Sequence, residues 1–403
     1  MSYDLALYVG RAAESSELIQ LVEQSSGLAI EPSDHDSITV VRGVKRAYCF
    51  TIDGPFDVDA EDIPEEITAV MLNPTHLYTV SAEGSSQPSI PHAIRFSRKA
   101  VALLGGAVLD QQADGVWSRG VSRSAPKPAR EERVNTVNLR WYVLREELDP
   151  NAATKYLALC RRFLPEALPR RFGGYEPLQG KLAVDGDEGF VSAWELEEMM
   201  LFFNGVSPCI DGHFSGGPNE RFPGKLWSIS LTFHAEPMRD KSWRDALRRL
   251  FLAVADELGA VFASAEVLVG NIWTGRSMWS DSQTERPTSP LARDGWMGLP
   301  PYPMWWAYYG KPYRDLAFPD NLVIHSEKTD HGTFHSRADM PADRTELTSA
   351  LKSGLFKRRT AEWVDAQLVT TYAPNERGYM NPPLNPAPRI PAELIDQSSR
   401  PTD

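Results

Sequence analysis

Residues 242–269, SWRDALRRLFLAVADELGAVFASAEVLV, decide the fold class of this chain. Apolar residues recur there at the spacing of one helix face, which predicts a helix over Trp243–Leu258. These residues are Leu247, Leu250, Phe251 and Val254. Gly259 follows, and a glycine at a helix C-terminus can turn the chain directly into a strand. The apolar run Val261–Val269 predicts that strand, so the stretch is typical of an α+β fold.

The first half of the chain has a similar order of elements. Leu104-Gly105-Gly106-Ala107-Val108 ends a predicted helix over 91–104, as Leu258-Gly259-Ala260-Val261 ends the later one. The first half is expected to hold strands at 5–9, 38–42, 48–53, 76–81 and 107–109 and helices at about 14–25 and 91–104. The second is expected to hold strands at 137–144, 190–197, 226–234 and 261–269 and helices at 150–163 and 243–258. We therefore predict two ferredoxin-like α+β modules in tandem, with an irregular aromatic C-terminal extension.

Prolines and charged residues indicate where the predicted domains begin and end. Arg119–Val134 is charged, carries two prolines and has little to bury, which is typical of a linker. Prolines are spaced through 373–403 so that neither helix nor sheet can persist. The expected domains are an acidic α+β module at 1–118, a linker at 119–134, a second α+β module with an aromatic loop at 135–345, a helical segment at 346–372 and a Pro-rich tail at 373–403.

The composition excludes some classes of function. A net charge of -12 argues against a protein that binds nucleic acid through a broad basic face. The acidity belongs to residues 1–118, with 17 Asp and Glu against 7 Lys and Arg. No run approaches the roughly 20 apolar residues that span a bilayer, and no leader segment is evident. Three distant cysteines form no disulfide framework. We expect a soluble cytoplasmic protein without membrane partners or a cofactor, and its oligomeric state stays open.

The most distinctive segment is WMGLPPYPMWWAYYGKPY, residues 296–313, which holds seven aromatic rings on a backbone broken by Gly and Pro. Such rings must cover a core, line a pocket or contact a partner, and Tyr and Trp suit the last two. The predicted partner-binding residues here are Trp305, Trp306, Tyr308, Tyr309 and Tyr313. We expect the two tryptophans to pack inward and the tyrosines to lie nearer the surface.

Three further groups could carry chemistry. His325, His331 and His335 lie within eleven residues and form a candidate metal site, against a solvated or hydrogen-bonding role. Cys209, with Asp211 and His213 beside it, could be a thiolate nucleophile, although cysteines are often simply buried. Arg170 and Arg171 follow Arg161 and Arg162 and could bind an anionic partner, or else complement the dipole of the preceding helix.

Two segments carry a resemblance to a known class of proteins. They are Trp305-Trp306-Ala-Tyr-Tyr309-Gly310-Lys-Pro312-Tyr313 and Leu168-Pro169-Arg-Arg171-Phe-Gly173-Gly-Tyr175-Glu-Pro177. Through them the chain resembles immunity proteins of bacterial toxin systems, such as the Imm52-like group, within residues 135–345. The resemblance implies a non-catalytic α+β protein that binds and blocks a cognate toxin.

Three hypotheses about function follow. The first is a non-catalytic protein-binding protein, an immunity protein that neutralises a bacterial toxin. The second is a metal- or cysteine-dependent hydrolase with its site near the aromatic loop, built on the histidines or on Cys209. The third is a phage-defence or regulatory component whose acidic N-terminal module engages a basic partner. A stoichiometric protein partner would favour the first, whereas a bound metal or metabolite would favour the second.

Overall fold

The computed structural model describes residues 3–31, 37–83, 87–110, 112–113, 115–119, 121–124, 132–197, 199–215, 226–274, 278–287, 291–292, 295–296, 304–311, 313 and 324–351. The chain forms two compact units, Met1–Arg130 and Glu131–Asp403. We call them unit 1 and unit 2 and describe each by itself. No helix in the described ranges is long and apolar enough to cross a membrane.

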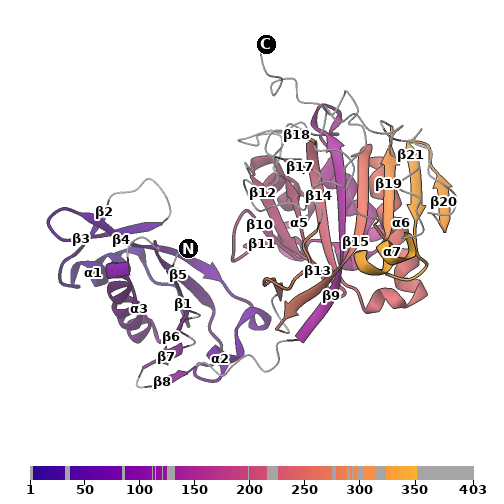
Figure 1. Ribbon diagram of the computed structural model, residues 1–403. Helices are drawn as coiled ribbons and strands as arrows, with labels where there is room; N and C mark the ends of the chain where they lie inside the picture. The colour runs from indigo at the N-terminus through magenta and orange to yellow at the C-terminus, as the bar shows by residue number, and fades with distance from the viewer. Residues whose placement is uncertain are drawn as a thin grey trace, which may run out of the picture. The chain divides into compact units, whose positions relative to one another are not determined.

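Unit 1 is built on one antiparallel sheet (Figure 1). Its elements are β1 (Tyr3–Val9), α1 (Ser15–Glu23), β2 (Leu28–Glu31), β3 (Ile38–Arg42), β4 (Ala47–Asp57), α2 (Glu65–Thr68), β5 (His76–Ala82), α3 (Ile90–Leu104), β6 (Gly106–Asp110), β7 (Gly115–Ser118) and β8 (Val121–Ser124). The strand order is β2-β3-β4-β5-β1-β6-β7-β8. Helices α1 and α3 bury their apolar sides with one face of this sheet in a single hydrophobic core.

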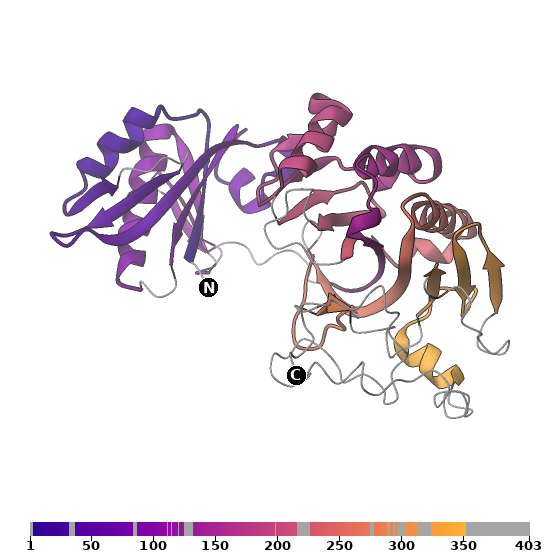
Figure 2. The ribbon, with the colours of Figure 1, turned by 90° about the horizontal axis from the view of Figure 1, so that it is seen from above.

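Unit 2 contains a larger antiparallel sheet, with the helices at 152–163, 182–196 and 241–257 along one face (Figure 2). Its main elements are β9 (Glu132–Leu144), α4 (Ala152–Phe163), β10 (Arg171–Gly173), β11 (Gly180–Lys181), α5 (Leu182–Leu196), β12 (Met200–Asn204), β13 (Cys209–Ser215), β14 (Leu226–His234), α6 (Lys241–Glu257), β15 (Ala260–Trp273), β19 (Trp306–Gly310), β20 (His325–Lys328), β21 (Gly332–Ser336) and α7 (Arg344–Leu351). The strand order is β11-β10-β12-β13-β14-β9-β15-β19-β21-β20. Short strands β16 (Met278–Trp279), β17 (Leu291–Ala292) and β18 (Gly295–Trp296) complete the unit, the first of them paired with β15.

The two units share one topology. In each, the first strand lies between the strands that precede and follow the long helix, in the orders β5-β1-β6 and β14-β9-β15, and is antiparallel to both neighbours. In each, the strands before that helix form a meander, β2 to β5 and β12 to β14. The expected α+β class with antiparallel sheets is therefore present twice. A ferredoxin-like module has only two strands between its helices, so that name describes too small a unit.

Helices α3 and α6 show the repeat at the level of single residues. Every buried position of α3 has a buried counterpart 154 residues later in or just after α6, as Leu104 has in Leu258. The α3 positions are Ala93, Phe96, Ser97, Ala100, Val101 and Leu104, and the α6 set is Leu247, Leu250, Phe251, Val254, Ala255 and Leu258. Gly105 and Gly259 follow with φ of 68° and 66°, the left-handed backbone that ends both helices. The two helices therefore present the same face to their sheets.

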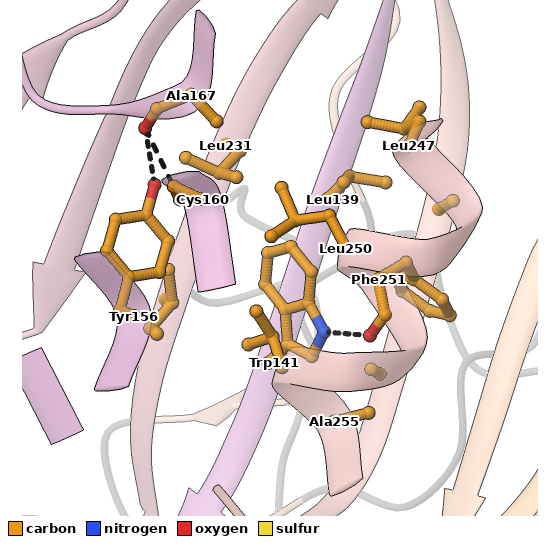
Figure 3. Close-up of a cluster of buried hydrophobic side chains, with 14 of the residues drawn as sticks. Leu139, Trp141, Tyr156, Cys160, Ala167, Leu231, Leu247, Leu250, Phe251 and Ala255 are labelled. Atoms are coloured by element: carbon orange, nitrogen blue, oxygen red, sulfur yellow. Dashed lines mark hydrogen bonds between the residues drawn. The ribbon is translucent and has the colours of Figure 1, made fainter. Parts of the chain in front are cut away.

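The core of unit 2 is aromatic, and two of its rings hold buried hydrogen bonds to backbone carbonyls. Trp141 on β9 donates its indole N–H to the carbonyl of Phe251 on α6 at 2.9 Å (Figure 3). Tyr156 on α4 donates its hydroxyl to the carbonyl of Ala167 at 2.8 Å. Because a buried donor without an acceptor is costly, the first bond fixes α6 against β9 and the second fixes the turn that follows α4.

Three sequence predictions are corrected by the structure. The strand expected at 190–197 is wrong, because Phe190 and Trp194 are one helical turn apart and both bury against the sheet from α5. The linker expected at 119–134 supplies β8 and the first residues of β9. The aromatic extension is not irregular at 306–310, where β19 is a fully buried strand. The helix expected at 346–372 is described only up to Leu351, within α7, and the tail at 373–403 lies outside the described residues.

Candidate protein-docking surface

Residues 304–310 and Tyr313 belong to the core of unit 2. β19 pairs with β15 on one side and with β21 on the other, so its backbone is hydrogen-bonded along both edges. Trp305 and Trp306 are buried and stack with their ring centroids 4.0 Å apart. The Trp305 indole donates to the Ala338 carbonyl at 3.0 Å. The expectation that these two tryptophans pack inward is confirmed.

The tyrosines of the same segment are buried as well, so their expected place near the surface is wrong. Tyr308 donates its hydroxyl to the Asp256 carboxylate on α6 at 2.6 Å, and burial together with that bond raises the pKa of the phenol well above its usual value. Tyr309 and Tyr313 lie on the opposite face of the sheet with Tyr142 and Phe262. A strand covered on both faces has no side chain to offer a partner, so none of the five aromatic candidates forms an exposed contact surface.

The three histidines do not converge. Ser326, and not His325, lies opposite His335 across β20 and β21, so the two imidazoles project from opposite faces of the sheet. His325 is exposed beside Arg248 and Glu327, whereas His335 is buried against the Tyr309 ring and His331 lies exposed in the intervening turn. Within the part of the chain that the structure describes, no three His, Cys, Asp or Glu residues are grouped to hold a metal ion.

Cys209 is a core residue and not a nucleophile. A β-bulge between Cys209 and Asp211 reverses the side-chain alternation there, which places the thiol in the core and leaves Asp211 exposed. Burial raises the pKa of the Cys209 thiol well above its usual value, so the reactive thiolate is disfavoured. Burial also lowers the pKa of His213 to about 4, helped by nearby Arg140, so that imidazole is neutral.

The arginine cluster holds the protein's own loops. The Arg171 side chain is buried and donates to the Leu178 carbonyl at 3.2 Å, which fixes the loop after β10. The backbone N–H of Arg170 donates to Asn204 on β12 at 2.7 Å. Arg161 on α4 pairs with Asp187 on α5. Arg161 and Arg171 therefore position the corner of the sheet where β10, β12 and α5 meet.

That corner carries a surface that the sequence did not reveal. Four large apolar side chains are exposed there, although such side chains are usually covered when they cluster. They are Tyr175, Leu196, Met199 and Phe202, with exposed fractions of 67, 76, 63 and 38%. We call them the corner patch. They come from the loop after β10, the end of α5 and strand β12.

The backbone brings these segments together. Gly173 on β10 pairs with Phe202 on β12, which places the loop that carries Tyr175 beside that strand. Gly174 lies so close to Glu197 that a Cβ there would collide with its carboxylate, and the backbone N–H of Met199 donates to the same carboxylate at 3.1 Å. This contact places the loop beside the end of α5. The backbone segments that carry the four apolar side chains therefore meet at one corner of the sheet, although they are up to 27 residues apart in the chain.

The corner patch stands on a rigid base. On the helix-covered face of the sheet at this corner, Phe172, Phe190 and Phe203 pack edge to face, with ring centroids 5.2 Å apart for the first pair and 6.1 Å for the second. Phe202 and Phe203 are consecutive on β12, so one ring points outward and the next into this cluster. A fixed base lowers the entropy that the patch would lose on binding, which favours a docking surface over a mobile loop.

Comparison with known proteins gives little guidance. No family model matches the chain, and no curated protein matches it. Among solved structures the chain is similar to the Pseudomonas aeruginosa T6SS protein PA0821, with 11% sequence identity and a TM-score of 0.33. That match covers 55% of this chain and 77% of the other. Likeness at this level carries no argument about function, which depends on the chain's own geometry.

Proposed function

We propose that this protein is a non-catalytic binding protein that engages another protein through the corner patch of unit 2. The observation that carries the proposal is the gathering of Tyr175, Leu196, Met199 and Phe202 at one exposed corner. Apolar clusters of this kind on soluble units are typical of protein interfaces. Aromatic residues and methionine are also the types enriched in such interfaces.

We further propose that the partner is a bacterial toxin and that the protein acts as its immunity protein. Tyr175 belongs to the segment 168–177 through which the chain resembles immunity proteins. An immunity protein needs a firm contact surface and no turnover. The corner patch meets the first requirement because it rests on the packed rings of Phe172, Phe190 and Phe203.

The hydrolase alternative has lost the groups on which it depended. Cys209 is buried in the core with a raised pKa, and the pKa of His213 is lowered to about 4, which makes that imidazole a weak base. His325 and His335 project from opposite faces of their hairpin. Among the residues of unit 2 that the structure describes, no other group favours a hydrolase over a binding protein.

Photo-crosslinking in the host cell tests this proposal. A photoreactive amino acid at Met199, 63% exposed in the corner patch, is expected to capture one predominant protein. The matched control places it at Met340, which is 43% exposed elsewhere in unit 2. We expect the Met340 position not to capture that protein. Equal capture at both positions, or none at Met199, would contradict the proposed docking surface.

A further inference from the structure

Unit 1 has a groove of its own, separate from the corner patch. It runs between α3 and β7 and is lined by Pro91, Ile94, Arg95, Arg98, Lys99, Ala102 and Trp117. The α3 residues recur at helical spacing, so they form one continuous stripe along the exposed side of the helix. The floor of the groove is apolar, and three cations stand along it.

These three cations lie in a part of the chain that is otherwise acidic. Residues 1–118 contain only 7 Lys and Arg, yet three of them line this groove. Arg98 stacks its guanidinium over the Trp117 ring, 5.9 Å from the centroid. None of the three forms an ion pair with a residue that the structure describes, whereas Arg11 in the same unit is paired with Glu17. The groove therefore offers positive charge that no described residue of unit 1 compensates with an ion pair.

Unit 2 shows what covers the same helix face in the repeated fold. Tyr308 on β19 pairs with core-facing Ala263, as Trp117 on β7 pairs with core-facing Val108, so the two rings occupy equivalent positions. Tyr308 is fully buried, with Thr329 and Gly332 of the β20–β21 hairpin against it. Trp117 is only half-buried.

The β20–β21 hairpin of unit 2 also compensates the charge of a cation on α6. Arg248 on α6 lies over the Phe334 ring at 5.0 Å and pairs with Glu327 of β20. In the described part of unit 1 the sheet ends at β8, so it holds no strand equivalent to β20 and no carboxylate equivalent to Glu327. The repeat therefore indicates both the shape and the charge of what the groove can accept.

We propose that the groove between α3 and β7 binds an extended acidic segment of a partner protein. Carboxylates of the segment pair with Arg95 and Lys99, and an apolar side chain covers Trp117, as the β20–β21 hairpin does for Tyr308. A protein segment is favoured over a nucleic acid because the rest of residues 1–118 is strongly acidic and would repel a phosphate backbone beyond the groove. This binding site is independent of the corner patch and of its proposed function.

Fluorescence anisotropy with the full chain tests the proposal. The probe is a fluorescein-labelled peptide that consists mostly of Glu with two Leu. Its length of about twelve residues is typical of peptides that bind in one groove. Arg95→Glu with Lys99→Glu is expected to weaken binding by at least about tenfold, since both charge pairs become repulsions. Lys45→Glu with Arg249→Glu changes the net charge equally outside the groove and should leave binding unchanged.

Each other outcome decides against the proposal. Absence of binding to the unaltered protein, or an equal loss in both double variants, would overturn it. Tighter binding of a labelled single-stranded oligonucleotide, lost in the groove variant alone, would assign the groove to nucleic acid. A dimer in sedimentation that disappears with Arg95→Glu and Lys99→Glu would assign it to a second copy of this chain. Circular dichroism confirms that the variants are folded, and Trp117→Ala tests the apolar contact separately.

Discussion

Trp305 and Trp306 illustrate how burial separates core residues from contact residues. Trp305 is fully buried, stacks on Trp306 and donates its indole N–H to Ala338. We expect Trp305→Ala to lower the free energy of unfolding by about 3–5 kcal/mol, because it removes a large ring from a closed core. Chemical denaturation measures the change.

The control for this prediction is Trp279→Ala, since that ring is 44% exposed on the short strand β16. We expect the control to cost less than about 1 kcal/mol. A Trp305 variant as stable as the control would show that these rings do not support the fold and would return the segment to the list of contact surfaces.

His335 gives unit 2 a defined dependence on pH. Burial, and secondarily the charge of Arg337, lower the pKa of its imidazole from 6.5 to about 4. Between those values the unfolded chain binds the proton and the folded chain does not, so stability falls as the pH drops from about 6.5 toward 4. We expect the unfolding free energy of the unaltered protein to fall by up to about 2 kcal/mol more than that of His335→Gln between pH 7 and pH 5. If the unfolding free energies of the two proteins changed equally with pH, the proposed role of His335 would be contradicted.

At the scale of elements, β19 depends on a close approach to β15. Gly310 lies against the Ala260 carbonyl so tightly that any Cβ would collide with it. We expect Gly310→Ala to cost more than about 2 kcal/mol or to prevent folding of unit 2, because two paired backbones cannot separate cheaply. Gly115→Ala on β7 is the control, since the nearest atom to its Cβ would be 3.8 Å away. Equal melting temperatures for the two variants would contradict the close approach of Gly310 to β15.

The elements that could be predicted from sequence are those with a clear period or a clear stop. Helices α3 and α6 were predictable because apolar residues repeat on one face and a glycine ends each. The strand predicted at 190–197 is part of α5 because Phe190, Val191 and Trp194, although residues that strands favour, have helical spacing. β19 was missed because the prolines before and after it suggested irregular backbone.

The candidate sites were harder to predict, for a physical reason. The corner patch joins three segments through a β-pairing and a glycine contact, and nothing in the spacing of Tyr175 and Met199 indicates that they meet. The sequence contains the three groove cations, but only the folded structure shows that they form no ion pair with a described residue. The residues that drew attention instead were aromatic, and large rings are most often core.

At the scale of the whole molecule, one topology is used twice with different surroundings. Unit 2 extends its sheet beyond β15 with β19, β21 and β20 and covers α6, whereas the described sheet of unit 1 ends at β8 beside an open groove. Unit 2 in turn exposes the corner patch at the opposite end of its sheet. The repeat therefore supplies two folded frameworks with different exposed surfaces, on which the proposed binding function rests.

The most direct test of this account is quantitative capture of the host partner by three tagged proteins. The unaltered chain is expected to retain one protein in stoichiometric amount, because it would bind tightly without turnover. Leu196→Asp with Met199→Asp, which places two charges in the corner patch, is expected to lose it at least about a hundredfold, since buried unpaired carboxylates are costly at an interface. Met340→Asp should retain it fully. Equal retention by all three folded proteins would contradict the claim that this corner is where the protein acts.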